Sequence, residues 1–333
     1  MATIKDVAKK AGVSIATVSR VINEVPNVKP IYIAKVDAAI KSLNYQPNIL
    51  AQSMKSHKQM VIGLIVPDFS SPFFGKVIKA IEKEFSSKYL VLFVDTYDDP
   101  EIERNGIQYM KSRGANVILI TSTGKNEDSL RSLKDSGLSV IFFDRRPKEN
   151  DQFPVVLQDK RDGTRKVLEL FTNMGHERIA IITGPSYLTS NEDRKLGVED
   201  FLENRDYYCD KIHCYFGTFS EEYGYQMAEK LLQKEESPTA ILTGSSIIAA
   251  GILLFCKEHD IRVPNDLSLV SFGDIASGQL IDPRLSYIDD EHSVISRLLI
   301  SLIQESFQKK LAPKEISISA HIIQNKSVFA RKS

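Results

Sequence analysis

The chain has 333 residues, and its 43 basic and 43 acidic side chains leave no net formal charge. This length predicts two to three domains, the apolar runs are too short to span a membrane, and no secretory signal opens the chain, so we expect a cytoplasmic protein without a membrane partner. The charge is uneven, because residues 1–59 hold nine basic and three acidic groups, whereas the remainder holds 34 basic and 40 acidic groups. A basic segment on an acidic body indicates a polyanionic partner for that segment alone.

The first segment predicts a small helical bundle. Thr3 and Asp6 have the spacing of a capping box, and Gly12 stands where a left-handed residue can end the helix. Ser14 is a suitable N-cap for a second helix, and Pro30 suits the first turn of a third. A tight turn between the first two helices, followed by a third, predicts a helix-turn-helix.

The second predicted helix leaves one face outside the bundle. Val18 points inward, so Ile15, Ala16 and Arg20 are expected on the outer face, which enters the major groove in a helix-turn-helix. Arg20 can donate two hydrogen bonds to guanine, and Ile15 and Ala16 can contact thymine methyl groups. A solvated helix with an incidental arginine is the alternative, and the completed three-helix pattern favours DNA binding.

From residue 61 onward, apolar runs alternate with helical patterns. The runs are continuous, which predicts strands buried on both faces of parallel sheets in a doubly wound α/β arrangement. They occupy residues 61–67, 89–96, 117–122, 139–144, 179–184, 240–244 and 267–272. This many units exceeds one small sheet, so we expect two lobes that divide near residues 159–163.

No nucleotide-binding or catalytic fingerprint lies on this scaffold. His176 stands at a helix-to-strand junction, where a structural histidine is the favoured interpretation. Asp98 and Asp99 precede Pro100 and are expected to cap a helix. The three cysteines lack zinc-site spacing and form an odd set, so we expect buried or semi-buried free thiols, no metal, no cofactor and no enzyme.

The segments TIKDVAKKAGVSIATVSRVIN and LNYQPNILAQSM closely resemble the DNA-binding headpiece of the LacI/GalR family of bacterial transcriptional regulators. The resemblance continues through PDFSSPFFGKVIKAIE, FFDRRP, SNEDRKLGVEDFL, PTAILTG and RVPNDLSLVSFGD. It implies an all-α helix-turn-helix headpiece over 1–46, a hinge helix and linker over 47–59, and a two-lobed, periplasmic-binding-protein-like α/β domain over 60–333. The N-subdomain would comprise about 60–160 and 292–319, and the C-subdomain about 161–291 and 320–333.

The resemblance also implies contacts with double-stranded operator DNA. Ile15, Ala16 and Arg20 match base-reading positions. Further DNA contacts are implied for Thr3, Ser14, Thr17, Asn23, Asn48, Ala51, Met54 and Lys55. In the family the hinge helix orders only on the operator and inserts a leucine into the minor groove, where this chain has Met54. A two-fold homodimer predicts a pseudopalindromic operator.

A sugar-type effector is implied in the cleft between the lobes. The matching positions are Ser71, Phe73, Phe74, Asp144, Arg146, Arg194 and Asp274. Phenylalanines suit the apolar face of a sugar, and aspartate and arginine suit its hydroxyl groups, although core packing and surface ion pairs are the alternatives. Ser245–Ser246 replaces the usual Asn-Asp and Gly273 replaces an aspartate, which favours a sugar acid or sugar phosphate.

The favoured function is a non-enzymatic homodimeric repressor of a carbohydrate-utilisation operon. The effector would select one lobe orientation and alter operator affinity through a coupling free energy of about 1–3 kcal/mol. The alternative is a sugar-binding protein or sugar-modifying enzyme with an incidental basic N-terminus. Salt-dependent binding of residues 1–59 to random DNA would discriminate between the two.

Overall fold

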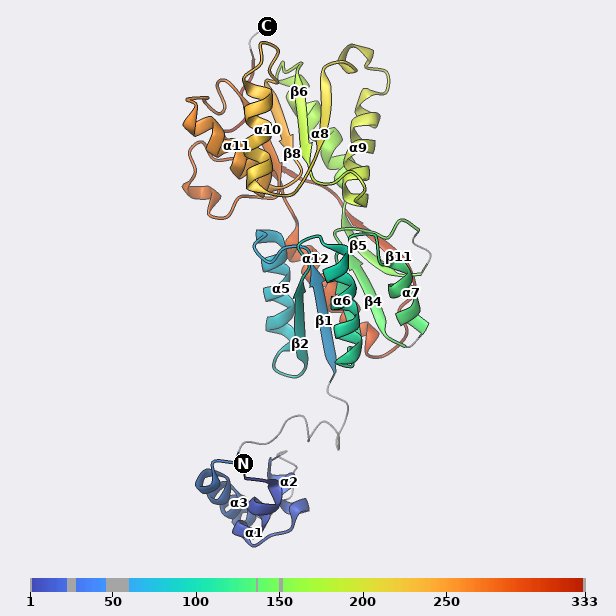
Figure 1. The fold of residues 1–333 in the computed structure, drawn as a ribbon, viewed down its shortest axis with the longest axis vertical. Helices are drawn as coiled ribbons and strands as arrows, with labels where there is room; N and C mark the ends of the chain where they lie inside the picture. Colours follow the sequence, from blue (N-terminus) through green and yellow to red (C-terminus); the bar gives the residue numbers. More distant parts are fainter. Residues whose placement is uncertain (1, 23–27, 46–59, 136, 150–151, 332–333) are drawn as a thin grey trace. The chain divides into compact units, whose positions relative to one another are not determined.

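The computed structural model describes residues 2–22, 28–45, 60–135, 137–149 and 152–331. These residues belong to two compact units, Met1–Gln59 and Met60–Ser333, which Figure 1 shows along the chain. Within the described residues, no helix is both long and apolar enough to cross a membrane.

The described residues of the smaller unit form a bundle of three helices, α1 (Ile4–Ala11), α2 (Ile15–Ile22) and α3 (Pro30–Leu43). Thr3 begins α1 with a capping box, because its hydroxyl accepts from the Asp6 N–H while the Asp6 carboxylate accepts from the Thr3 N–H. Gly12 ends α1 with a φ of +68°, a backbone conformation that glycine adopts without steric cost. The helices enclose an apolar core of Val7, Ala8, Ala11, Val18, Val36 and Ala39.

The larger unit contains two lobes, each built on a six-stranded sheet. The sheet of the N-lobe has the strand order β11-β5-β4-β3-β1-β2, and every neighbouring pair is parallel. Its strands are β1 (Val61–Val66), β2 (Leu90–Asp95), β3 (Val117–Ile120), β4 (Ser139–Phe143), β5 (Pro154–Gln158) and β11 (Lys314–Ile318). Its helices are α5 (Pro72–Phe85), α6 (Pro100–Ser112), α7 (Glu127–Asp135) and α12 (His292–Ser306).

The sheet of the C-lobe has the order β12-β10-β9-β8-β6-β7 and is parallel except for the β10–β12 pair. Its strands are β6 (Ile179–Thr183), β7 (Ile212–Phe216), β8 (Ala240–Thr243), β9 (Ser268–Phe272), β10 (Ser286–Ile288) and β12 (Ile322–Ile323). Its helices are α8 (Lys160–Asn173), α9 (Thr189–Leu202), α10 (Glu221–Leu232) and α11 (Ser246–Glu258), with 3₁₀ turns at Asp206–Tyr208 and Gly278–Leu280.

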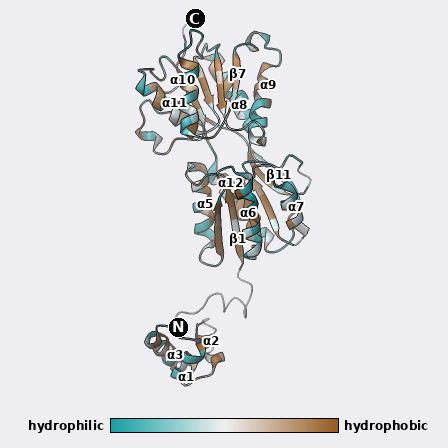
Figure 2. Ribbon diagram, in the orientation of Figure 1, coloured by the Kyte–Doolittle hydropathy of each residue, from teal (hydrophilic) through white to brown (hydrophobic). Residues whose placement is uncertain are grey.

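The central strands are buried on both faces, which explains their continuous apolar sequences. In β1, Ile62 and Leu64 face the core beneath α5 and α12, whereas Ile65 faces the core beneath α6 and α7. Figure 2 shows the same distribution, with hydrophobic strands between helices whose outer faces are hydrophilic. The seven predicted runs each contain a strand, and the predicted doubly wound arrangement is confirmed.

The chain passes between the lobes at three places. These crossovers connect β5 to α8, β10 to α12, and β11 to β12. The carboxyl ends of strands from both sheets contribute to one cavity, because residues directly after β1, β4, β8 and β9 line it. Ligands bind at this end of the strands in open parallel sheets.

Candidate nucleic-acid interface and ligand pocket

One face of helix α2 is exposed to solvent and carries both polar and apolar side chains. Val18 is fully buried, whereas Ile15 is 43% exposed and both Ala16 and Arg20 are exposed. Ser14 holds the start of the helix, since its hydroxyl accepts from the Thr17 N–H at 3.1 Å. The helix therefore exposes the side chains that would have to reach base edges.

The small unit also exposes basic side chains. The described basic residues of the small unit are all exposed: Lys5, Lys9, Lys10, Arg20, Lys29, Lys35 and Lys41. Its described acidic residues are Asp6 and Asp37, and Asp6 is tied to Thr3 in the capping box. The predicted hinge helix over 47–59 and the predicted contacts Asn23, Asn48, Ala51, Met54 and Lys55 lie outside the described residues.

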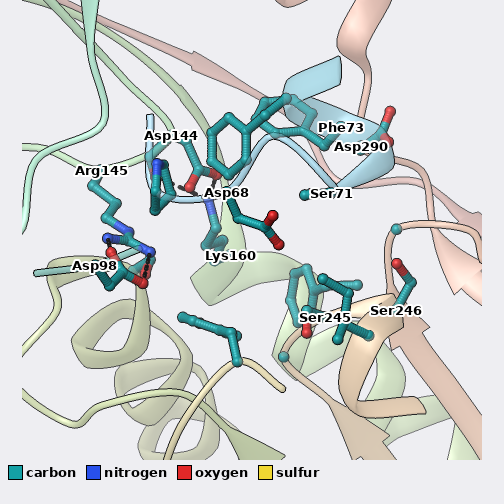
Figure 3. A pocket seen from close by; sticks show the side chains of 18 of the residues that line it. Asp68, Ser71, Phe73, Asp98, Asp144, Arg145, Lys160, Ser245, Ser246 and Asp290 are labelled. Atoms are coloured by element: carbon teal, nitrogen blue, oxygen red, sulfur yellow. Dashed lines mark hydrogen bonds and ion pairs between the residues drawn. The ribbon is translucent and has the colours of Figure 1, made fainter. Parts of the chain in front are cut away.

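A cavity of about 540 Å³ lies between the two lobes. Six of the predicted effector residues line it: Ser71, Phe73, Phe74, Asp144, Arg194 and Asp274. The seventh, Arg146, is not among the lining residues, and its neighbour Arg145 takes that place. Figure 3 shows Phe73 and Ser71 on one side of this space and Ser245 and Ser246 on the other.

The N-lobe supplies an aromatic wall. The rings of Phe73 and Phe74 meet edge to face with centroids 5.0 Å apart, and Phe74 packs in the same way on Phe143 at 6.0 Å. Phe74 is 7% exposed, whereas Phe73 is half-buried. Phe74 therefore belongs chiefly to the core, and Phe73 is the ring that a ligand can reach.

Two ion pairs are formed by residues that line the cavity. The Lys160 ammonium donates to Asp144 Oδ1 at 2.8 Å and to the Asp144 carbonyl at 3.0 Å. Arg145 binds both carboxylate oxygens of Asp98, as Figure 3 shows. Burial alone would raise the pKa of the Asp144 carboxyl. The Lys160 and Arg145 cations lower this pKa by a larger amount, so it lies below the ordinary value. The Asp144 carboxylate is thus held as an anion.

Arg194 lies on the C-lobe wall of the cavity and has no carboxylate partner among the residues that the structure describes. It is 4% exposed, and its guanidinium lies 4.3 Å above the Phe272 ring. Nη1 donates to the Ser190 carbonyl at 3.1 Å and to Asn191 Oδ1 at 2.7 Å, and Nη2 donates to the Gly244 carbonyl at 2.9 Å. Burial lowers the pKa of Arg194 to about 10, although Asp144 opposes this effect. The guanidinium is positioned by neutral groups only.

Each of the two units matches a known protein family. Residues 3–48 match the model of bacterial regulatory proteins of the lacI family, and residues 168–328 match the periplasmic binding protein-like domain. The HTH-type transcriptional repressor PurR of Haemophilus influenzae (strain PittEE) is 30% identical over 334 residues, which cover 98% of this chain and 99% of PurR. The chain belongs to the LacI family of bacterial regulatory proteins. It is a DNA-binding transcriptional regulator with a ligand-binding domain.

Further relatives fit this LacI-family assignment. The ribose operon repressor of Halalkalibacterium halodurans is 31% identical over 310 residues, which cover 92% of this chain and 91% of that protein. The structure of the Lac repressor dimer bound to operator and the anti-inducer ONPF superposes with a TM-score of 0.83 at 23% identity, covering 99% of each chain. The helix-turn-helix and two-lobed fold predicted from the sequence are confirmed.

In this LacI-family protein, Arg146 joins the two lobes. It follows β4 of the N-lobe, and its guanidinium binds both carboxylate oxygens of Asp193 in α9 of the C-lobe. Thr189 Oγ1 donates to the Arg146 carbonyl at 2.9 Å, and Lys148 approaches Glu192 at 3.7 Å. These contacts form a rim beside the cavity that depends on the lobes being close together.

Several lining residues had no signal in the sequence. Lys160 begins α8 directly after a crossover, and only the fold brings it to Asp144. Asp98 was expected to cap a helix but pairs with Arg145, whereas Asp99 alone accepts from the first N–H groups of α6. Sequence reasoning missed both partners because each contact joins segments that lie far apart in the chain.

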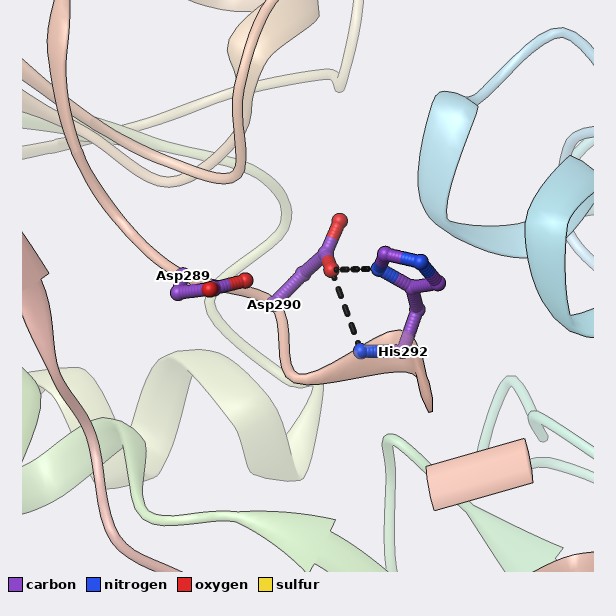
Figure 4. Close-up of side chains that lie close together, drawn as sticks. All are labelled: Asp289, Asp290 and His292. Atoms are coloured by element: carbon purple, nitrogen blue, oxygen red, sulfur yellow. Dashed lines mark hydrogen bonds and ion pairs between the residues drawn. The ribbon is translucent and has the colours of Figure 1, made fainter. Parts of the chain in front are cut away.

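The crossover before α12 carries a cluster of titratable groups (Figure 4). Potential ligand atoms of Asp289, Asp290 and His292 lie within 4.8 Å of one another. Asp290 Oδ1 accepts from the His292 N–H at 3.1 Å and meets His292 Nδ1 at 2.8 Å. These hydrogen bonds organise the start of α12, and Asp290 also lines the cavity.

His176 has a structural role, as expected. It is 2% exposed, and its ring nitrogens meet Thr239 Oγ1 at 3.0 Å and the Phe329 carbonyl at 3.1 Å. Burial lowers the pKa of His176. The three cysteines are free, but the expectation of burial is wrong for Cys209, which is exposed because it lies in the turn after α9.

Proposed function

We propose that the chain is a homodimeric transcriptional repressor that binds a pseudopalindromic operator and controls a carbohydrate-utilisation operon. The observation that carries the proposal is the outward face of α2, where Ile15, Ala16 and Arg20 are exposed on a unit whose described basic side chains are all exposed. A face of this kind enters the major groove and reads base edges. Binding to a chromosomal operator places the protein in the bacterial cytoplasm.

The cavity between the lobes is the proposed effector site. Phe73 offers a ring to the apolar face of a sugar, and Asp144 and Asp274 offer acceptors to its hydroxyl groups. A ligand that contacts both lobes favours one relative orientation of them, and the crossovers carry that preference through the domain. The relative named a ribose operon repressor supports a sugar-type effector.

The proposed function is non-enzymatic. Two acidic side chains of the cavity are engaged in short ion pairs, Asp144 with Lys160 and Asp98 with Arg145. Groups tied in this way support binding rather than proton transfer to a substrate, because a catalytic base needs a free acceptor within reach.

The test is operator selection with the full chain, followed by affinity measurements on the selected sequence. Arg20→Ala should weaken binding about 10–100-fold, which corresponds to about 1–3 kcal/mol, and relax selection at one base pair in each half-site. The control Arg113→Ala removes an exposed arginine of the N-lobe and should leave operator affinity unchanged. Failure to bind even random DNA at low salt would refute the repressor and favour a sugar-binding protein.

A further inference from the structure

One part of the C-lobe wall combines unpaired donors with a buried cation. Arg194 and Ser190 both line the cavity and are 4% and 3% exposed. Neither Arg194 Nε nor Ser190 Oγ has a hydrogen-bond partner in the structure. Since Arg194 Nη1 and Nη2 are held in place by carbonyl and amide oxygens, the guanidinium is oriented before any ligand arrives.

The charge of Arg194 is also uncompensated at short range. Among the described residues, no carboxylate oxygen lies within 4.0 Å of its guanidinium, although most buried ions are paired. The two carboxylates whose charge raises the pKa of Arg194 already have cations of their own, since Asp144 binds Lys160 and Asp193 binds Arg146. A buried cation without a counter-ion is costly, and a bound anion would remove that cost.

The amino end of α11 lies beside this guanidinium. Gly244, whose carbonyl accepts from Arg194, is followed directly by Ser245 and by Ser246, the first residue of the helix. Gly244 is needed for this approach, because a Cβ there would lie 2.0 Å from Thr183 Oγ1. Ser245, Ser246 and Ile247 all line the cavity.

No acidic side chain stands in the first turn of α11, where the Ser245 hydroxyl accepts from the Ile248 N–H at 3.4 Å. The first N–H groups of a helix lack intrahelical partners and carry partial positive charge, so they attract anions. Five other helices of the larger unit (α6 to α10) carry acidic side chains in the first turn, whereas α5 and α12, like α11, carry none. A ligand anion at α11 would therefore meet no carboxylate from this turn of the helix.

We propose that Arg194, Ser190 and the amino end of α11 form an oxyanion site, and that the effector is an acidic sugar derivative whose carboxylate or phosphate binds there. This rests on the proposed function and names its ligand class. The sugar hydroxyl groups face acceptors elsewhere in the cavity, where Asp274 Oδ1 has no hydrogen-bond partner in the structure. A cavity of about 540 Å³ has the size of a small-molecule site.

The decisive experiment uses the full chain and inorganic phosphate as the probe. Phosphate should raise the thermal midpoint above that in chloride at equal ionic strength, and calorimetry should give its dissociation constant. Ser246→Asp places a carboxylate in the first turn of α11, so it should raise the midpoint without phosphate and weaken phosphate binding about 10–100-fold. The neutral variant Ser246→Asn should retain the phosphate response.

The outcomes test the oxyanion site and the proposed repressor function independently of each other. An equal phosphate response in the wild type and Ser246→Asp overturns the oxyanion site, whereas wild-type operator binding is measured separately and tests the repressor. The comparison between variants also removes the general stabilisation that phosphate gives to folded proteins. Lys195→Ala is a further control, because it removes an exposed cation next to Arg194 and should not alter phosphate binding.

A second arm distinguishes the source of the anion. D-glucose, D-glucuronate and D-glucose 6-phosphate are titrated under the same conditions. Tighter binding of glucuronate than of glucose supports a carboxylate, and tighter binding of glucose 6-phosphate supports a phosphate. Tighter binding of glucose than of both charged probes overturns the acidic ligand class.

Discussion

The Arg146–Asp193 pair is the contact whose loss should most directly open the cleft. Arg146 follows β4 in the N-lobe and Asp193 lies in α9 of the C-lobe, so the pair exists only when the lobes are close. Arg146 Nη2 donates to Asp193 Oδ1 at 2.6 Å, and Nη1 donates to the other carboxylate oxygen. Asp193→Asn keeps the side-chain size but removes the charge and one acceptor.

The magnitude follows from the burial of the pair. The Arg146 and Asp193 side chains are 27% and 17% exposed, which lies between a surface pair and a buried one. Surface ion pairs contribute about 0–1 kcal/mol, and hydrogen bonds to charged groups contribute about 1.5–3 kcal/mol. We therefore expect a loss of about 1–2 kcal/mol, which shifts the equilibrium between open and closed lobes about 5–30-fold.

Hydrogen exchange by mass spectrometry on the full chain measures this shift. Amides in the rim segments 144–148 and 187–191 should exchange about 5–30-fold faster in Asp193→Asn, because local opening exposes them. Amides of the central strands β3 and β8 should exchange at the wild-type rate, since each lobe keeps its own core.

Asp200→Asn is the matched control. Asp200 lies on the same helix and also binds an arginine through both oxygens, but its partner Arg161 belongs to the same lobe. Its loss should leave exchange in the rim segments unchanged. The reasoning is refuted if Asp193→Asn has wild-type exchange at the rim, or if Asp200→Asn accelerates the rim equally.

Two further predictions concern the hinge and the C-lobe. Met54→Leu should bind operator equally or more tightly, whereas Met54→Ala should bind more weakly, because an apolar wedge must unstack a base step; normal bending of operator by the alanine variant would argue against a wedge. His176 is favoured in its neutral form, so its folded pKa lies below the unfolded value of about 6.5 and its contribution to stability is lost as pH falls below that value. His176→Phe should lower the unfolding free energy by about 1–3 kcal/mol near pH 7.5 through two lost hydrogen bonds. In that variant the thermal midpoint should fall less between about pH 7.5 and pH 5, and an unchanged slope would contradict this role.

Local chemistry was sufficient to predict the small unit and most of the central strands, although the central strands β5 and β10 were not predicted. The Thr3–Asp6 capping box, the left-handed Gly12 and the Ser14 cap depend on contacts within a few residues, and all three are present. The central strands were recognisable because burial on both faces demands continuous apolar sequence. Edge strands such as β7 and β11 were missed because they are partly exposed and carry polar side chains.

The sequence by itself determined the three helices of the small unit and seven of the strands, and six of the seven residues that the family resemblance implies for the effector line the cavity. Only the tertiary structure decided which partner each charged side chain has. Arg146 and Arg194 are both arginines of recognisable segments, yet Arg146 binds Asp193 across the lobes, whereas Arg194 is buried and pairs with no carboxylate of the described ranges. Charge interactions act through space over a few ångströms, whereas the partners here are separated by tens of residues in the chain, so their pairing is a property of the fold.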